Sequence, residues 1–284
     1  MKRIIYKVFV GLYERVGLGK KFHPSYDIIL IIGGSSNKLG IEICKTFIED
    51  YHTKVINVDT VDNIDEKEIK KASSKFYTFI PCKDFSNIEY LEESLLDVQK
   101  LEIYPTILIN NMQEGIESTF LREDQFPKLN EESLCEFEKI VRYNLQSIIL
   151  ITKFCISTLF PKAHVGLQTE MKRFYIINIS TVLTLRPSKV GTHFITSKSG
   201  INSFHDGITS ELSLKDSNLN VKTLLAYLPD FKSHEHWENL SPTISKQLVC
   251  CLVDGRYGDT VLGSKRSIGD ILLLAELKNS FIDN

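Results

Sequence analysis

The alternation of short apolar runs with amphipathic segments most constrains how this chain can fold. A run such as DIILIIGG (residues 27–34) contains no polar alternation, which is typical of a strand buried on both faces of a sheet. Segments with apolar residues at steps of three and four, typical of helices, follow most of these runs. The runs expected to form strands are residues 27–34, 54–59, 76–81, 105–111, 173–180 and 221–229, with a seventh candidate at 259–263.

Strands that alternate with helices predict βαβ units and a parallel sheet with right-handed crossovers. We therefore expect the α/β class: a Rossmann-like, doubly wound, mostly parallel sheet of six or seven strands with helices on both faces. The main expected helices are residues 39–51, 88–99, 132–160 and 192–213. Near the C-terminus, Ser241 as the N-cap and Pro242 at the first helical position predict a further helix over residues 241–255.

Both ends of the chain carry apolar helical patterns outside this alternation. Residues 1–21 combine an apolar stripe with six Lys and Arg residues against one acid, Glu14. Such a segment either lies in a membrane interface or packs on the domain. An apolar-rich helix is also expected over residues 268–282, packed on the sheet or a second subunit, or exposed to a membrane or a substrate. We treat residues 1–26 as a separate segment and residues 27–284 as one domain.

Composition narrows the function classes. The net charge of −2 argues against a nucleic-acid partner, because such proteins usually have a strongly basic face. None of the six cysteines forms a CxxC pair or a zinc-ligand spacing, so we expect no metal site. Buried free thiols in a reducing, intracellular compartment are the simplest interpretation. No uninterrupted apolar stretch of about 20 residues occurs, so an ordinary membrane-spanning helix is not expected.

The segment GGSSNKLG (residues 33–40) follows the first strand and opens the first helix, which is the context of a dinucleotide-binding turn. The backbone N–H groups at such a helix start reach a pyrophosphate. Gly34 and Gly40 occupy outer glycine positions, while Lys38 replaces the middle glycine and either crowds the phosphates or neutralises them. The residues expected to contact the cofactor here are Gly34, Ser36, Lys38, Leu39 and Gly40. The alternative is a structural turn without a ligand.

Two acids follow the next strands. Asp59 ends the second strand, 19 residues after Gly40, where a carboxylate accepts hydrogen bonds from the adenosine ribose and repels a 2′-phosphate. This position favours NAD over NADP, although a strand-end Asp also commonly caps a turn. Asp84, just after the third strand, is a candidate for the adenine edge.

Taken in order, seven motifs resemble the short-chain dehydrogenases/reductases over residues 27–263. They are GGSSNKLG, KDFSN, INNMQEG, YNLQS, NIST, FITSK and LPDFKSH. The phrase VDTVD, the helix INSFHDGITSEL and the basic N-terminus are most similar to the membrane-associated retinol and hydroxysteroid dehydrogenase branch. This resemblance implies hydride transfer between C4 of a nicotinamide and the carbonyl carbon of a hydrophobic alcohol or ketone.

Carried over by position, the family's catalytic residues fall on Asn144, Thr181, Phe194 and Lys198. The resemblance implies that Asn144 holds a water, that Thr181 offers a hydroxyl to the substrate and that Lys198 binds the nicotinamide ribose. It also implies cofactor contacts at Asn110, Asn111 and Pro229. Phe194 departs from the family because it stands where the catalytic tyrosine is expected and has no proton to donate. A positioned acid–base typically contributes about 10² to 10⁴ in rate.

Other changes bear on the same site. His234 is a candidate surrogate acid, whereas Tyr175 lies within the fifth strand, where nothing places its hydroxyl at the carbonyl. Met112, Gln113 and Asp230 replace small residues of the family pattern.

Two functions follow from this pattern. One is an NAD-dependent oxidoreductase acting on a hydrophobic small molecule such as a steroid, retinoid or other lipid. The other is a pseudoenzyme that senses NAD(H) or serves as a membrane-associated scaffold. The expected partners are a hydrophobic ligand, a peripheral membrane contact through residues 1–21 and a second copy in a homodimer. The expected location is the cytoplasm or the surface of the endoplasmic reticulum or of lipid droplets.

Overall fold

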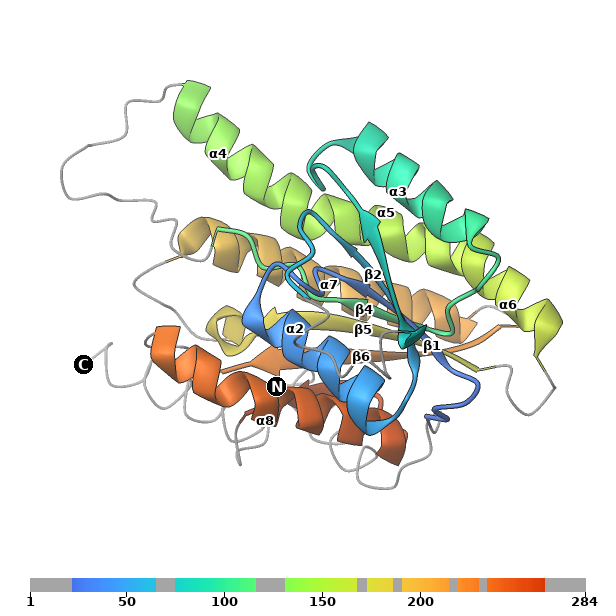
Figure 1. Cartoon of the computed structure of the whole chain (residues 1–284). Helices are drawn as coiled ribbons and strands as arrows, with labels where there is room; N and C mark the ends of the chain where they lie inside the picture. Colours follow the sequence, from blue (N-terminus) through green and yellow to red (C-terminus); the bar gives the residue numbers. More distant parts are fainter. Residues whose placement is uncertain are drawn as a thin grey trace.

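Seven parallel strands form one sheet in the order β3-β2-β1-β4-β5-β6-β7 (Figure 1). This confirms the predicted α/β class and all seven predicted strands, each within two residues at both ends. The strands are β1 (Ile28–Ile32), β2 (Lys54–Asp59), β3 (Tyr77–Pro81), β4 (Ile107–Asn110), β5 (Arg173–Thr181), β6 (Asn220–Leu228) and β7 (Gly258–Val261).

The computed structural model describes residues 22–64, 75–115, 131–167, 173–185, 191–214, 219–229 and 234–263. Its helices are α2 (Lys38–Lys45), α3 (Ile88–Lys100), α4 (Glu131–Val141), α5 (Ser147–Phe154), α6 (Phe160–Gly166), α7 (Thr192–Leu214) and α8 (His234–Asp254). The predicted segment 1–21 and the predicted helix 268–282 lie outside the described residues.

The chain reverses direction across the sheet between β1 and β4. β1 pairs with β2 on one side and with β4 on the other, and the strands then continue outward to β7. In open α/β sheets, ligands bind outside the carboxyl ends of the strands at such a reversal. The fold therefore places the segments after β1 and β4 at the expected ligand crevice.

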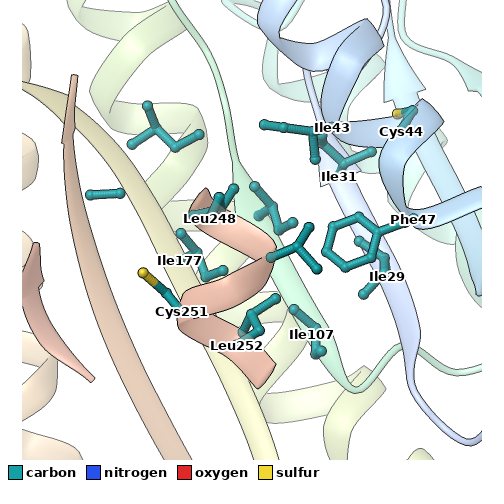
Figure 2. Close-up of a cluster of buried hydrophobic side chains, with 14 of the residues drawn as sticks. Ile29, Ile31, Ile43, Cys44, Phe47, Ile107, Ile177, Leu248, Cys251 and Leu252 are labelled. Atoms are coloured by element: carbon teal, nitrogen blue, oxygen red, sulfur yellow. The ribbon is translucent and has the colours of Figure 1, made fainter. Parts of the chain in front are cut away.

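Two apolar cores lie on opposite faces of the sheet. Ile29 and Ile31 of β1 join the core beneath α2 and α8, where Phe47 and Leu248 also lie (Figure 2). Leu30 of the same strand points to the other core, which side chains of α3 and α5 complete. The continuous apolar run in β1 follows from burial on both faces, and each fully buried large apolar side chain contributes about 1.5–3 kcal/mol.

The predicted helix 132–160 is one end-to-end helical stretch from Glu131 to Gly166 that contains two π-helical segments. These segments are Arg142–Gln146 and Cys155–Leu159. Among the described residues, Cys135–Gly166 is the one helix long and apolar enough to cross a membrane by length and composition. Residues such as Ile148 and Ile151 pack into the core beside the sheet, as in the core helix of a globular domain.

The prediction for the helix near the C-terminus is wrong at its start. α8 begins at His234, so Ser241 and Pro242 lie inside the helix rather than at its first turn. Ser241 and Ser245 are buried, and Ser245 Oγ donates to the Glu42 carbonyl of α2 at 2.9 Å. Packing against α2 therefore keeps this stretch helical on both sides of the proline.

The packed domain also includes residues that precede the predicted boundary at residue 27. Phe22 is buried, and its ring makes edge-to-face contacts with Phe47 and Tyr51, both at 5.5 Å between ring centroids. Its backbone N–H donates to the Leu252 carbonyl at 3.2 Å. The chain therefore enters the domain between α2 and the end of α8.

Substitution of two glycines tests how closely the start of α2 packs against the turn that precedes it. A Cβ at Gly40 would lie 2.4 Å from the Gly33 carbonyl oxygen, whereas a Cβ on exposed Gly207 of α7 would meet nothing within 4 Å. We expect Gly40→Ala to lower the free energy of unfolding by about 1–3 kcal/mol because the backbone must move. Gly207→Ala should raise it by about 0.5–1 kcal/mol through helix propensity. Urea denaturation of both variants measures the difference, and equal effects would contradict the close packing at Gly40.

Candidate functional site

The turn after β1 passes very close to the segment after β4. Gly33 has a φ of 78°, the left-handed region that favours glycine, and a Cβ there would lie 3.0 Å from the Asn111 carbonyl oxygen. Gly34, the predicted first glycine, has no positive φ, but a Cβ on it would lie 2.5 Å from Asn57 Oδ1. The sequence pattern did not single out Gly33, whose conformation forms the tight turn.

Lys38 is accommodated without backbone strain. Among the described residues, only His52 and Glu102 are non-glycine residues with positive φ. Lys38 is the first residue of α2, and its Nζ lies 3.2 Å from Glu42 Oε1 in an ion pair. The ammonium therefore already has an anionic neighbour on its own helix, and the neighbouring Leu39 is buried.

Asp59 accepts hydrogen bonds from the backbone of the glycine turn. Its Oδ2 accepts hydrogen bonds from the backbone N–H groups of Ser35 and Ser36, both at 2.7 Å, and its Oδ1 accepts from Thr60 N at 2.7 Å. The side chain has no exposed surface. The predicted ribose contact remains a prediction, and the observed partners of this carboxylate are turn amides.

A polar layer that the sequence analysis missed supports the same turn. Asn57 Oδ1 accepts from Gly34 N at 3.0 Å, and Asn57 Nδ2 donates to Ser35 Oγ at 2.7 Å and to the Tyr77 hydroxyl at 2.9 Å. The Tyr77 hydroxyl in turn donates to Asp62 Oδ1. The available signal was the single asparagine in the otherwise apolar run KVINVD.

Several acidic groups lie in the neighbourhood of Tyr143. Asp84 Oδ1 accepts from both the backbone N–H and the hydroxyl of Ser86, at 2.8 and 2.7 Å. Nearby, the Tyr143 ring makes an edge-to-face contact with Phe85 at 5.4 Å. Burial raises the pKa of Tyr143, and the charges of Asp59, Glu114 and Asp84 raise it further. Tyr143 was not predicted, although it precedes Asn144 directly.

The two asparagines after β4 point in different directions. Asn110 Nδ2 donates to Asn178 Oδ1 at 2.8 Å and to Thr152 Oγ1 at 3.3 Å, so its side chain is buried between β5 and α5. Asn111 Nδ2 instead donates to the Gly33 carbonyl at 2.6 Å and to Asn37 Oδ1 at 3.3 Å. Of this predicted pair, Asn111 is the one whose side chain reaches the glycine turn.

Asn144 lies inside the π-helical segment Arg142–Gln146. Such segments often mark functional sites. Its Oδ1 accepts from Glu114 N at 2.9 Å, and its Nδ2 donates to the Glu114 carbonyl at 2.7 Å and to Ser197 Oγ at 3.1 Å. Ser197 Oγ donates to the Phe194 carbonyl at 2.7 Å. Asn144 therefore connects the segment after β4 to the helix that carries Phe194 and Lys198.

Lys198 is enclosed by backbone carbonyls and one aromatic ring. Its Nζ donates to the Met112 carbonyl and, at 3.0 Å, to the Ile179 carbonyl, and it lies 5.6 Å from the centroid of the Phe194 ring. Only 1% of Lys198 and 3% of Phe194 are exposed. Burial lowers the pKa of Lys198 to about 7.

The remaining predicted positions lie in β5 or directly after β6. Thr181 ends β5, is 5% exposed, and its Oγ1 accepts from Leu183 N at 3.3 Å. Pro229 directly follows β6 and packs against the turn at Gly263. Tyr175 is aligned with Ile107 at the entry of β4, at the opposite end of the strands from Thr181.

Two further predicted positions lie partly or wholly outside the described residues. Asp230 lies outside the described residues, and the side chain of His234 is not described. Among the described residues, no group of three His, Cys, Asp or Glu side chains is arranged to hold a metal ion.

Comparison with known proteins decides the family. The family model for short chain dehydrogenase matches residues 27–228. The chain belongs to the short-chain dehydrogenase/reductase family. It is 71% identical over 281 residues to the oxidoreductase-like protein SRL4 of Saccharomyces cerevisiae, covering 99% of this chain and 100% of that protein. It is 23% identical to the 3-oxoacyl-[acyl-carrier-protein] reductase FabG of Buchnera aphidicola, covering 88% and 91% of the two chains.

Solved structures of short-chain dehydrogenases/reductases share the fold. The NADH-dependent reductase A1-R′ complexed with NAD has a TM-score of 0.63 and 14% identity, covering 88% of this chain and 96% of that one. A metagenomic short-chain oxidoreductase in complex with NADP has a TM-score of 0.59 and 16% identity, covering 83% and 96%. Family members of this fold thus occur with either nucleotide, and the fold alone does not choose between them.

The turn geometry fits a dinucleotide of the kind this family binds. The glycine turn opens α2, whose Asn37 N-cap accepts from Gly40 N, and the first N–H groups of a helix favour a phosphate. Glycine at positions 33 and 40 allows the turn to pack closely, because a Cβ there would lie 3.0 Å from the Asn111 carbonyl oxygen and 2.4 Å from the Gly33 carbonyl oxygen, respectively. Of the positions that the resemblance predicts to be catalytic, the structure brings Asn144, Phe194 and Lys198 together: Asn144 donates to Ser197, and the Phe194 ring lies beside Lys198 Nζ.

Lys198 provides a pH test of this short-chain dehydrogenase/reductase site. A lysine whose pKa is about 7 in the folded state and about 10.4 when unfolded binds fewer protons folded than unfolded between these values. Stability from this group therefore rises with pH across that window, by up to about 1.4 kcal/mol per pH unit. In Lys198→Met this dependence disappears. The unfolding free energy of the wild type minus that of the variant should therefore increase from pH 7 to pH 10.

The control for this test is Lys246→Met, at an exposed position of α8, for which the gap to the wild type should change little with pH. Denaturant titrations at several pH values measure both gaps. A gap for Lys198→Met that stays constant across the window would show that Lys198 keeps its charge in the folded protein.

Proposed function

We propose that this protein binds NAD(H) at the crevice between β1 and β4 and that it transfers hydride to carbonyl compounds slowly, because its site lacks the family's proton donor. The observation that carries the proposal is the Phe194 ring, which lies 5.6 Å from Lys198 Nζ at the position of the catalytic tyrosine. The protein is thus a cofactor-binding family member with a low rate of catalysis. A role in sensing NAD(H) fits it better than rapid turnover.

Dinucleotide binding is supported by the turn and by the sheet topology. The nicotinamide group, when bound, supplies or accepts the hydride. Gly33, Gly40 and the start of α2 provide a tight backbone turn at a helix N-terminus, which suits a pyrophosphate. The sheet reverses at the same place, between β1 and β4.

The charges around the crevice favour NAD over NADP. Asp59, Asp84 and Glu114 each raise the pKa of Tyr143 electrostatically, so all three carboxylates lie in the neighbourhood of this residue. A 2′-phosphate would bring further negative charge to this neighbourhood, and Lys38 is already paired with Glu42. Like charges at short range are unfavourable, and the penalty grows where solvent is excluded.

Proton transfer to the carbonyl oxygen is the step for which the described residues are poorly suited. Reduction of a carbonyl needs a proton at the oxygen as the hydride reaches the carbon, and a phenol beside an ammonium is well suited to give it. Here Lys198 directs its Nζ protons to the Met112 and Ile179 carbonyls, and Phe194 carries no hydroxyl. Thr181 offers a hydroxyl that can orient an oxygen without ionising readily.

Restoring the phenol tests the chemical half of the proposal. We expect Phe194→Tyr to raise NADH-dependent reduction of a panel of hydrophobic ketones and aldehydes by about 10² to 10⁴ over a slow wild type. The matched control is Phe194→Leu, which keeps an apolar side chain and should remain slow. Absorbance of NADH at steady state measures the rates. Rapid turnover by the wild type, with no gain in Phe194→Tyr, would contradict this half.

The binding half is tested separately by titration calorimetry or NADH fluorescence. We expect NADH to bind the wild type, and NADPH to bind at least about tenfold more weakly, because about 1.4 kcal/mol of charge repulsion gives that ratio. Equal affinities would contradict the charge argument. Failure of both nucleotides to bind would overturn the proposed function and leave a scaffold without a nucleotide.

A further inference from the structure

Gln113 lies at the end of a chain of side-chain amides that crosses the proposed crevice. Asn37, the N-cap of α2, accepts from Asn111 Nδ2 at 3.3 Å, and Asn111 Oδ1 accepts from Gln113 Nε2 at 3.0 Å. Asn37 and Asn111 belong to the turns after β1 and β4, so this amide chain joins the two sides of the sheet reversal. Asn111 is buried, whereas Gln113 is partly exposed.

The backbone on both sides of Gln113 is held in place. Asn111 N donates to the Ile32 carbonyl of β1 at 2.9 Å, and Asn111 Nδ2 donates to the Gly33 carbonyl at 2.6 Å. On the other side, both the N–H and the carbonyl of Glu114 bond to the Asn144 side chain. A change at Gln113 is therefore confined to its side chain, which can rotate towards solvent without moving the segment.

The Gln113 amide donates to the remaining polar atom of the Asn111 side chain. Asn111 Nδ2 is committed to Gly33 and Asn37, which leaves Asn111 Oδ1 as the atom available to a partner from the crevice. In the structure that partner is Gln113 Nε2. A sugar hydroxyl is a donor of the same kind, so a nucleotide in this crevice and the Gln113 carboxamide compete for one acceptor and for the same space.

We propose that the Gln113 side chain acts as a latch on the nucleotide crevice: it closes over Asn111 and must rotate away before NAD(H) enters. This inference rests on the proposed function, since it concerns the same site. The bond between Gln113 and Asn111 is a neutral hydrogen bond at a partly exposed position. Such a bond shifts an open–closed equilibrium by about twofold to tenfold.

A latch of this kind has a kinetic signature. When only the open form binds, the apparent Kd equals the intrinsic Kd divided by the open fraction. With opening fast relative to binding, a smaller open fraction lowers the association rate and leaves the dissociation rate unchanged. A glutamine that contacted the bound nucleotide would instead change the dissociation rate.

The experiment is stopped-flow NADH fluorescence on the wild type, Gln113→Ala and Gln99→Ala. Gln99 is a partly exposed glutamine on α3 and controls for loss of a carboxamide elsewhere. We expect Gln113→Ala to raise the association rate, and to lower the Kd, by about twofold to tenfold, with an unchanged dissociation rate. Gln99→Ala should match the wild type.

The other outcomes separate the two proposals. Binding by Gln113→Ala and not by the wild type supports the latch. Equal rates in the wild type and Gln113→Ala overturn the latch and leave NAD(H) binding intact. A faster dissociation in Gln113→Ala also overturns it, because Gln113 would then hold the nucleotide rather than exclude it. Absence of binding in all three proteins overturns the proposed function and the latch together.

Discussion

The contact between the turn after β1 and the segment after β4 holds the candidate site together. These strands pair side by side where the sheet reverses, so no strand connection covers their carboxyl ends. Asn111 closes the gap with its backbone N–H to Ile32 and its side chain to Gly33. A β-carbon at Gly33 would be 3.0 Å from the Asn111 carbonyl, so the approach depends on glycine.

The same short segment connects the nucleotide half of the site to the catalytic half. The carbonyl of Met112 accepts from Lys198, and the backbone of Glu114 is held by Asn144. Asn144 also reaches Ser197, one residue before Lys198. Residues 111–114 therefore contact both halves, and a substitution in this segment is felt at the glycine turn and at the lysine alike.

The sequence predicted the features that depend on local pattern. Burial on both faces makes each strand a largely apolar run, so β2 was predicted with its observed ends, and the order of the motifs predicted the family that the family model confirms. Features that depend on partners distant in sequence were missed. The start of α8 depends on packing of Ser245 against α2, and the left-handed φ of Gly33 depends on the nearby Asn111. An acid at Asp59 could be placed from the sequence, but its turn-amide partners could not.

Burial sets the electrostatics of Lys198. Moving a lysine ammonium from water into the protein interior costs several kcal/mol of desolvation free energy. Interactions with two carbonyl dipoles and the face of one aromatic ring offset only part of this cost. A tyrosine could share a proton with the ammonium, whereas Phe194 contributes only its ring, and burial therefore lowers the pKa of Lys198 to about 7. An anionic group brought near Nζ would raise that pKa again. Binding of an anion beside Nζ would thus be coupled to uptake of a proton near neutral pH. The protonation state of Lys198 would then depend on whether the site is occupied.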